Sequence, residues 1–359
     1  MSFINRIGTA VPPNDVHLAF LGFARTMLAD ERARALFDRM AERSGIAHRH
    51  SYFRPGRLEA GEVDADGFYQ RGHFPGTGAR MRQYEPWALQ LALAAVARLE
   101  LGAAGAASIT HLVVASCTGF SAPGLDLQLA DRLGLDGGVA RTIIGFMGCS
   151  AAVPALRTAH QIVASDPSAR VLVVNCELST LHLQETADLE TVLSFMLFAD
   201  GCAAALVTAE PVGIELLDFR AKTLPDSAGL ITWHVGDQGF DMHLSGKVPG
   251  RIAQALRAEL GEDGPGGLLR GQGTQAVDLW AVHAGGRTVL DAVEIGLGLP
   301  ASALAHSRQV LRDHGNMSSA TVMFVLAAML AAGRPGARGL AMAFGPGVVA
   351  ETFRFQMAA

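Results

Sequence analysis

From about residue 105 to the C-terminus, short runs rich in valine and isoleucine alternate with longer runs rich in alanine and leucine. β-Branched residues favour strands, and strands that are apolar throughout are typical of a sheet covered by helices on both faces. The pattern therefore predicts an α/β protein. The expected strands are HLVVAS, RVLVVNCE, CAAALVTA, VGIELLDF, LWAVHA and GLAMAFGPG. The expected helices are WALQLALAAVARLEL, GLDLQLADRL, SAAVPALRTAHQIVAS, IAQALRAEL, RTVLDAVEIGL and MSSATVMFVLAAML.

The first 100 residues are more polar, and the segment from Arg54 to Arg82 is rich in glycine and charge, which predicts irregular structure or a surface insertion. The most apolar window, Ala320 to Ala332, is shorter than the roughly 20 residues that a membrane-spanning helix needs. We expect a buried helix there. The N-terminal segment lacks a basic stretch followed by an apolar run, so no secretory signal is expected.

Two helix starts resemble each other. Gly148-Cys149-Ser150-Ala151-Ala152 opens one apolar helix, and Gly315-Asn316-Met317-Ser318-Ser319-Ala320 opens another. Helices that are apolar on every side are buried, so the pair predicts a duplicated α/β unit whose two central helices begin at one site. The alternative is coincidence, because glycine and small residues open many helices.

Composition limits the function. The formal net charge of -5 and the pI near 6.2 argue against a general nucleic-acid or anionic-membrane partner, since both select a cationic surface. The four cysteines form no CxxC pair, and no histidine spacing suits a structural zinc site. We therefore expect a reduced, cytoplasmic compartment and no metal. With 50% hydrophobic residues, the chain can fill one large core or two halves around a continuous core.

Three separated segments each present one member of a Cys/His/Asn set: Cys149, His283 and Asn316. A thiolate holds an acyl group as a thioester, while an imidazole and a carboxamide donate hydrogen bonds to a carbonyl that becomes an enolate. The set therefore indicates carbon–carbon bond formation. Cys149 opens a predicted helix, so the macrodipole and a neighbouring imidazolium are expected to lower its pKa toward neutrality.

Each residue has a plainer interpretation. A lone cysteine is usually a small buried hydrophobe, and Asn316 before an apolar helix is usually an N-cap. The position of His283 favours a functional role. It ends a predicted strand and precedes Gly285-Gly286, a turn that lets a ligand approach the backbone closely.

Taken with their neighbours, these segments resemble the type III polyketide synthases, the chalcone synthase-like family. The resemblance runs from IGTAVPPND through ASCTGFSAPGLDLQLADRLGL, GCSAA, RVLVVNCELS, LFADGCAAALV and VPG to GNMSSA and FGPG. It implies a thiolase fold, an αβαβα sandwich of two similar halves, and a homodimer. The halves are expected at 1–211, carrying the nucleophilic cysteine, and 212–359, carrying the histidine and asparagine.

The resemblance also implies roles. Cys149 matches the acyl-accepting nucleophile, His283 its partner, Asn316 the second donor of the oxyanion site and Phe198 an aromatic gate between the CoA tunnel and the cavity. The other expected substrate-binding residues are Arg39, Arg43, Cys117, His182, Trp233, Met242 and Ser318. Arg39 and Arg43 match two of three basic positions that hold CoA phosphates. The third is Leu36 here, so we expect Arg34 or another nearby cation to contribute.

Several positions depart from the plant pattern. Met242 replaces the second gate aromatic, and Ala284 replaces the proline that follows the catalytic histidine. Trp233 stands where plant chalcone synthases have glycine, and His182 where they have threonine. Cys117 also replaces a threonine, which looks like the bacterial branch of the family, so a plant-type flavonoid product is not expected.

The implied reaction is repeated decarboxylative condensation of malonyl-CoA onto an acyl-CoA starter held on Cys149, followed by cyclisation to a pyrone or alkylresorcinol-type ring. It releases free CoA and needs no metal or redox cofactor. One alternative is a single condensation of the ketoacyl-ACP synthase III kind, and the other is a catalytically silent thiolase-fold protein that binds acyl-CoA. The sequence gives neither the starter nor the number of extensions, because both depend on the cavity.

Overall fold

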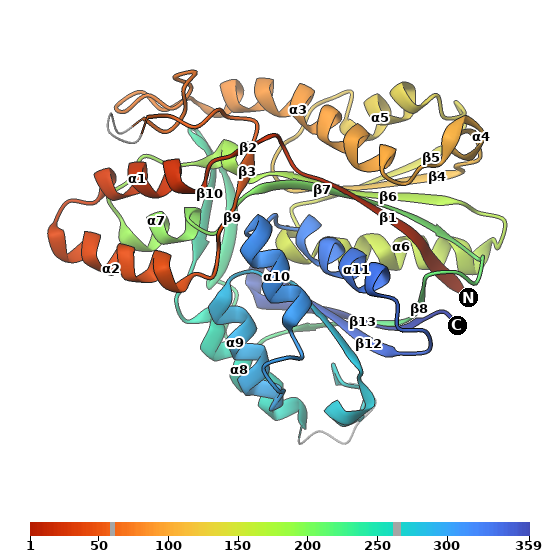
Figure 1. The fold of residues 1–359 in the computed structure, drawn as a ribbon. Helices are drawn as coiled ribbons and strands as arrows, with labels where there is room; N and C mark the ends of the chain where they lie inside the picture. The colour runs from red at the N-terminus through yellow and green to blue at the C-terminus, as the bar shows by residue number, and fades with distance from the viewer. Residues whose placement is uncertain (58–61, 261–266) are drawn as a thin grey trace.

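The computed structural model describes residues 1–57, 62–260 and 267–359 (Figure 1). Within these residues the main feature is a nine-stranded mixed sheet with the order β11-β12-β13-β8-β1-β7-β6-β4-β5. Its N-terminal strands are β1 (Ser2–Ala10), β4 (His111–Ser116), β5 (Ala140–Gly145), β6 (Val171–Leu178) and β7 (Asp200–Thr208). Its C-terminal strands are β8 (Ile214–Thr223), β11 (Leu279–Val282), β12 (Arg338–Gly345) and β13 (Val349–Met357). The antiparallel pair β1 and β8 joins the two sets.

Helices form three layers around this sheet. The N-terminal strands are covered on their outer side by α3 (Thr77–Ala97), α4 (Gly102–Ala107) and α5 (Leu125–Leu133), and the C-terminal strands by α8 (Val248–Leu260) and α9 (Arg287–Leu297) (Figure 1). Between the two sets of strands lie α6 (Ala152–Ser165) and α11 (Ala320–Ala332). The result is an αβαβα sandwich.

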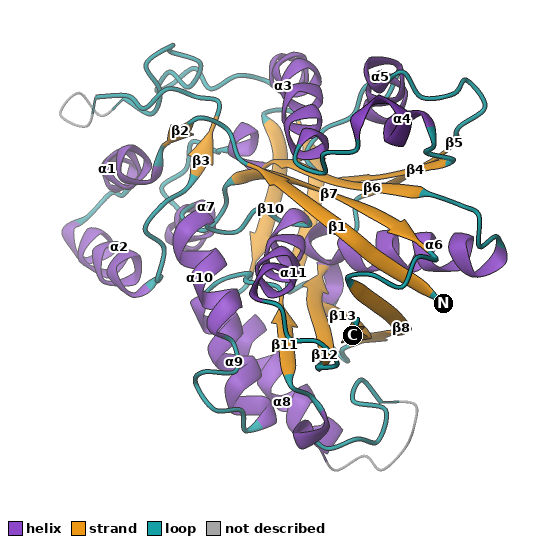
Figure 2. Cartoon of the chain, turned by 45° about the vertical axis from the view of Figure 1, so that its right-hand side comes forward, coloured by secondary structure: helices purple, strands orange, loops and turns teal. Residues whose placement is uncertain are grey.

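The remaining elements lie beside the sandwich (Figure 2). They are α1 (His17–Met27), α2 (Glu31–Arg43), α7 (Leu189–Phe195), α10 (Ala305–His314), the short pair β2 (Asn14–Asp15) and β3 (His50–Ser51), and the hairpin β9 (Ile231–Gly236) and β10 (Gly239–Leu244). Single helical turns at Gly148–Ser150, Ser179–His182 and Pro346–Val348 border the site described below.

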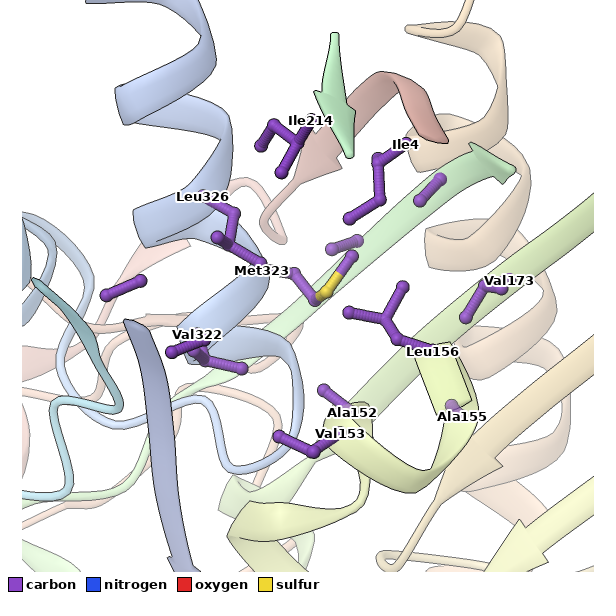
Figure 3. Packing of buried hydrophobic residues seen from close by; sticks show 14 of the residues in the cluster. Ile4, Ala152, Val153, Ala155, Leu156, Val173, Ile214, Val322, Met323 and Leu326 are labelled. Carbon is purple, nitrogen blue, oxygen red and sulfur yellow. The ribbon is translucent and has the colours of Figure 1, made fainter. Parts of the chain in front are cut away.

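The two central helices are buried because their surfaces are apolar on nearly every side. Met323 of α11 lies beside Leu156 of α6 in one core cluster (Figure 3). The same cluster includes Ile4 and Val173 from the N-terminal strands and Ile214 from the C-terminal ones. The core is therefore continuous across the two halves, and it fixes the starts of both central helices relative to each other.

The predicted strands and helices are confirmed within the ranges above, and so is the burial of Ala320–Ala332. None of the helices in the described ranges has the length and apolarity needed to span a bilayer. The boundary expected at 211/212 falls between β7 and β8, which belong to one sheet, and it stays a prediction.

The expectation for Arg54 to Arg82 is partly wrong. Residues 54–57 and 62–76 are mainly irregular, and 58–61 lie outside the described residues. Helix α3, however, begins at Thr77. Its Arg80 is fully buried, because the guanidinium donates to the carbonyls of Pro75, Leu181 and Leu183 at 2.7–2.8 Å. Arg80 thus joins two loops through buried hydrogen bonds. The number of charged residues in the segment does not show that this one is buried.

Candidate active site

Cys149 lies in the helical turn that leads into α6. Gly148 before it has a φ of +57°, and a Cβ there would lie 2.6 Å from Pro346, so only glycine permits this turn. The Cys149 Sγ is 4.0 Å from the Asn316 Oδ1. The two helix starts that resemble each other in sequence thus meet at one point.

Asn316 is held by the backbone on both sides. Its N–H donates to the Leu197 carbonyl at 2.8 Å, and its carbonyl accepts from the Ala199 N–H at 2.9 Å, which ties it to the segment carrying Phe198. Its Nδ2 donates to the Gly285 carbonyl at 3.1 Å, and its Oδ1 accepts from the Ser318 N–H at 2.9 Å. The side chain therefore caps the turn before α11 and also keeps one amide hydrogen for the cavity.

His283 follows directly after β11, and its backbone N–H donates to the Met342 carbonyl at 2.8 Å. The ring is buried, and neither ring nitrogen has a hydrogen-bond partner among the described residues. A Cβ at Gly285 would lie 3.3 Å from its Nε2, so glycine avoids crowding this buried nitrogen. Burial lowers the pKa of His283 to about 3, which keeps the imidazole neutral.

The expectation of a lowered pKa for Cys149 is wrong for this state. Burial raises the pKa of the thiol to about 11, although hydrogen bonds with Ser318 and Asn316 act in the opposite direction. The physical reason is that the walls are apolar and His283 is uncharged, so no imidazolium stabilises a thiolate. Cys149 and His283 are therefore both neutral near pH 7.

All three residues line one cavity that encloses about 720 Å³, partly open to solvent. The same wall contains five of the other expected residues: Cys117, Phe198, Trp233, Met242 and Ser318. Trp233 and Met242 face each other across the β9–β10 hairpin, and the Trp233 Nε1 donates to the Cys117 carbonyl at 2.8 Å. The indole is thereby fixed in the cavity wall.

His182 differs from expectation, because it lies behind the wall. Its Nε2 donates to the Thr118 carbonyl at 2.7 Å, and its Nδ1 accepts from the Phe240 N–H at 3.0 Å. Only the neutral tautomer with a proton on Nε2 makes both bonds, and burial lowers its pKa to about 3. His182 supports Thr118, which does line the cavity.

Glu177 is a residue that sequence reasoning missed. This fully buried carboxylate on β6 accepts from the Cys117 N–H and the Thr118 hydroxyl at 2.9 Å and from the Ser319 hydroxyl at 2.6 Å. Burial raises its pKa to about 7. It links the cavity wall to the start of α11, and a glutamate at the end of the largely apolar run VLVVNCEL is the signal that would have revealed it.

Arg39 and Arg43 are exposed on α2, and neither side chain has an ion-pair partner within the described part of the chain. Arg34 differs, because it pairs with Glu31 at 3.4 Å and donates to the Leu28 carbonyl. Arg287 at the start of α9 donates to the Arg43 carbonyl at 3.2 Å, so a third guanidinium lies beside α2.

The sandwich and the Cys/His/Asn cavity define a thiolase-fold acyltransferase. Residues 2–211 match the family model for chalcone and stilbene synthases, N-terminal domain, and residues 215–358 match the corresponding C-terminal domain. The chain therefore belongs to the chalcone and stilbene synthase family, and it is a type III polyketide synthase.

Individual relatives agree with this assignment. The chain is 34% identical to bisdemethoxycurcumin synthase of Oryza sativa over 370 residues, which span 96% of this chain and 90% of that protein. It is also 34% identical to the alpha-pyrone synthesis polyketide synthase-like Pks18 of Mycobacterium tuberculosis, over 70% of this chain and 66% of that protein. The structure of 1,3,6,8-tetrahydroxynaphthalene synthase from Streptomyces coelicolor matches with a TM-score of 0.87 and 28% identity, and the match covers 99% of both chains. The thiolase fold is confirmed, while the bacterial branch stays a prediction.

Proposed function

We propose that this enzyme loads an acyl group from acyl-CoA onto Cys149 and extends it repeatedly with malonyl-CoA. The observation that carries the proposal is the convergence of the Cys149 thiol, the His283 ring and the Asn316 amide on one cavity. Decarboxylation supplies the driving force, so the cycle calls for no metal or redox cofactor.

Loading begins when the Cys149 proton moves to His283, because the buried pair is neutral before substrate enters. The thiolate then attacks the thioester carbonyl, the bond to the CoA sulfur breaks, and the proton leaves with CoA. Malonyl-CoA next loses CO2, and the remaining electron pair forms an acetyl-CoA enolate. Its oxygen accepts from the His283 Nε2–H and the Asn316 Nδ2–H. The enolate carbon attacks the Cys149 thioester carbonyl, the bond from this carbon to Sγ breaks, and the electron pair returns to Cys149 as a thiolate. The product is a β-ketoacyl-CoA two carbons longer.

The cavity favours acetyl-like or fatty acyl starters over p-coumaroyl-CoA. Trp233 is a rigid ring in the wall, while Met242 has a flexible side chain that moves aside for a linear chain. With such starters the products are pyrones or alkylresorcinol-type rings. The mycobacterial relative is named for alpha-pyrone synthesis, which supports this choice.

Arg39, Arg43 and Arg287 are proposed to bind the CoA phosphates at the cavity entrance. Arg287 comes two residues after Gly285 and two before Val289, and both of these line the cavity. Arg287 supplies the cation that Leu36 does not. It also pairs with Asp291 at 3.6 Å, as Arg34 pairs with Glu31 at 3.4 Å, but Arg287 is the one that lies between two cavity-lining residues. Guanidinium groups suit phosphates because they offer several donors in one plane.

A homodimer that assembles through β5 in the cytoplasm is the proposed state. β5 is the last strand of the sheet, and its residues are largely exposed although it pairs in parallel with β4. Phe120 and Ile143 beside this edge are 46% and 49% exposed. An uncovered sheet edge with large apolar side chains is typical of a protein–protein interface.

The test is mass spectrometry of products formed from malonyl-CoA with acetyl, fatty and aromatic acyl-CoA starters. We expect products with more than one extension in the absence of acyl carrier protein. Cys149→Ala should abolish condensation but leave slow malonyl-CoA decarboxylation, because His283 and Asn316 remain. A single extension that requires carrier protein would favour the ketoacyl-ACP synthase III alternative, and failure of Cys149 to form any acyl adduct would favour a silent binder.

A further inference from the structure

A second, smaller cavity lies directly behind Phe198 and Ser179, and the space between its walls is about 460 Å³ including a part open to solvent. Both residues also line the catalytic cavity, so they form a partition between the two spaces. The second cavity lies where α1, β3 and α7 come together beside the sandwich (Figures 1 and 2). Its apolar lining consists of Val16, Phe20, Phe53, Val63, Leu183, Phe195 and Phe198.

Arg49 adds a buried cation to this apolar lining. Its side chain is only 2% exposed. The Nε donates to His17 Nδ1 at 2.9 Å, and Nη1 donates to the carbonyls of Phe195 at 2.9 Å and Phe198 at 2.7 Å. Nη2 has no partner among the described residues. Its hydrogen-bond partners are all neutral, and its Cζ lies 4.5 Å from the centre of the Phe20 ring. The carboxylates of Asp15 and Asp200 attract this charge, but neither forms an ion pair with it among the described residues. A buried guanidinium without an ion-pair partner is costly, so Arg49 favours a further anion.

The neighbouring polar groups are already satisfied. The hydroxyls of Ser51 and Thr180 bond each other at 2.8 Å, and Tyr69 donates to the Thr180 carbonyl at 2.7 Å. Asp200, which lies behind the wall, accepts from the Thr180 N–H and hydroxyl. Burial raises the pKa of Asp200 to about 7, so near neutrality it supplies only part of a negative charge to Arg49.

Backbone hydrogen bonds connect this partition to Arg49 on one side and to Asn316 on the other. The Phe198 carbonyl accepts from Arg49, while the next residue, Ala199, donates its N–H to the Asn316 carbonyl. Apolar side chains line both faces of the Phe198 partition, and Arg49 lies on the far side. A linear chain anchored on Cys149 would reach the Arg49 guanidinium by an apolar path if the Phe198 ring turned aside.

We propose that the second cavity is a subsite for the far end of a linear acyl starter held on Cys149, and that it selects a chain ending in a carboxylate that pairs with Arg49. This inference rests on the proposed function, because the starter must first be loaded on Cys149. The preferred class of starter is the mono-CoA thioester of a medium-length dicarboxylic acid.

The experiment measures loading of Cys149 by intact-protein mass spectrometry with acetyl-CoA, octanoyl-CoA and the mono-CoA thioester of octanedioic acid. Wild-type protein should load the carboxyl-ended chain about tenfold or more faster than octanoyl-CoA at low substrate, the size expected for a hydrogen bond to a charged group. Val63→Trp fills the second cavity and should slow both eight-carbon starters while sparing acetyl-CoA. Val212→Trp, at a valine that is 58% exposed and lines neither cavity, is the matched control.

Arg49→Met should remove the preference for the carboxylate and retain octanoyl loading. The wild-type comparison and Val63→Trp decide the question even where Arg49 variants do not fold. Equal loading of the two eight-carbon starters by wild type overturns the carboxylate preference, and eight-carbon loading that Val63→Trp leaves unchanged overturns the subsite. Loss of loading with every starter, acetyl-CoA included, would instead contradict the proposed function.

Discussion

Replacing the buried Glu177 with glutamine should change how the stability of this enzyme depends on pH. The substitution preserves shape, because the glutamine carbonyl accepts from the Cys117 N–H and Thr118 hydroxyl while its amide donates to the Ser319 oxygen. Glutamine, however, never ionises. The comparison therefore isolates the free energy of a single buried carboxylate.

The sign follows from proton binding. Burial raises the pKa of Glu177 from 4.5 to about 7, so in this window the folded protein retains a proton that the unfolded chain has released. Stability therefore falls as the pH rises through the window, and the loss is complete above the folded-state pKa. Because one pKa unit corresponds to about 1.4 kcal/mol, the full loss is about 3 kcal/mol.

Urea unfolding of wild type and Glu177→Gln at several pH values between about 5 and 8 measures this difference. The stability of the variant relative to wild type should increase by roughly 2 to 3 kcal/mol across the range. Other buried groups, such as Asp200 and His182, titrate in both proteins and cancel. Glu210→Gln, at an exposed glutamate outside the cavity, should show no such trend. A difference that is constant with pH, or that favours wild type more strongly at high pH, would refute the reasoning.

Three further substitutions test the cavity. Asn316→Ala should slow malonyl-CoA decarboxylation by roughly 10²–10³, the usual cost of one oxyanion donor, while acyl loading measured by mass spectrometry stays nearly unchanged; equal loss of both would indicate a structural cap. Cys117→Ser should keep loading on Cys149, and a starter adduct mapped to Cys117 in wild type would contradict this. Trp233→Gly should enlarge the cavity and shift products toward longer polyketides or wider starters. An unchanged product spectrum from the folded Trp233→Gly enzyme would show that the indole does not limit the cavity.

The elements that could be predicted from the sequence are those whose residues are apolar along almost their whole length. β6 and α11 are buried along nearly their whole length, so their apolar runs indicated both their type and their position. The charged helix α2 was not predicted, because Phe37 is its only buried residue and a wide apolar face is lacking, although Asp30 as N-cap and the helix formers after it were an available signal. Strand β13 was missed for a different reason, because it is largely buried although its sequence VAETFRFQM mixes polar and apolar residues. One of its two partners, β8, comes from far along the chain.

The residues of the candidate site likewise fall into those that the sequence indicated and those that only the structure revealed. Cys149, His283 and Asn316 were found because each stands in a recognisable local sequence, and the structure brings them to one cavity. Glu177 and Arg49 were not found, because what distinguishes them is burial, which arises only when distant segments pack. His182 shows the converse error: its position in the motif suggested a wall residue, whereas its hydrogen bonds place it behind the wall.

Under the proposed function, the neutrality of Cys149 and His283 opposes acyl loading and favours decarboxylation of malonyl-CoA. Acyl loading requires charge separation, since a thiolate must form where burial raises the pKa of Cys149 to about 11. Decarboxylation needs a neutral imidazole that donates from Nε2, and burial provides it by lowering the pKa of His283 to about 3. The same apolar wall strengthens hydrogen bonds to the enolate oxygen, because an apolar environment screens them less than bulk water does. Under the proposed mechanism, the apolar cavity therefore favours the extension step, and the thiolate for loading forms only as part of an ion pair with His283.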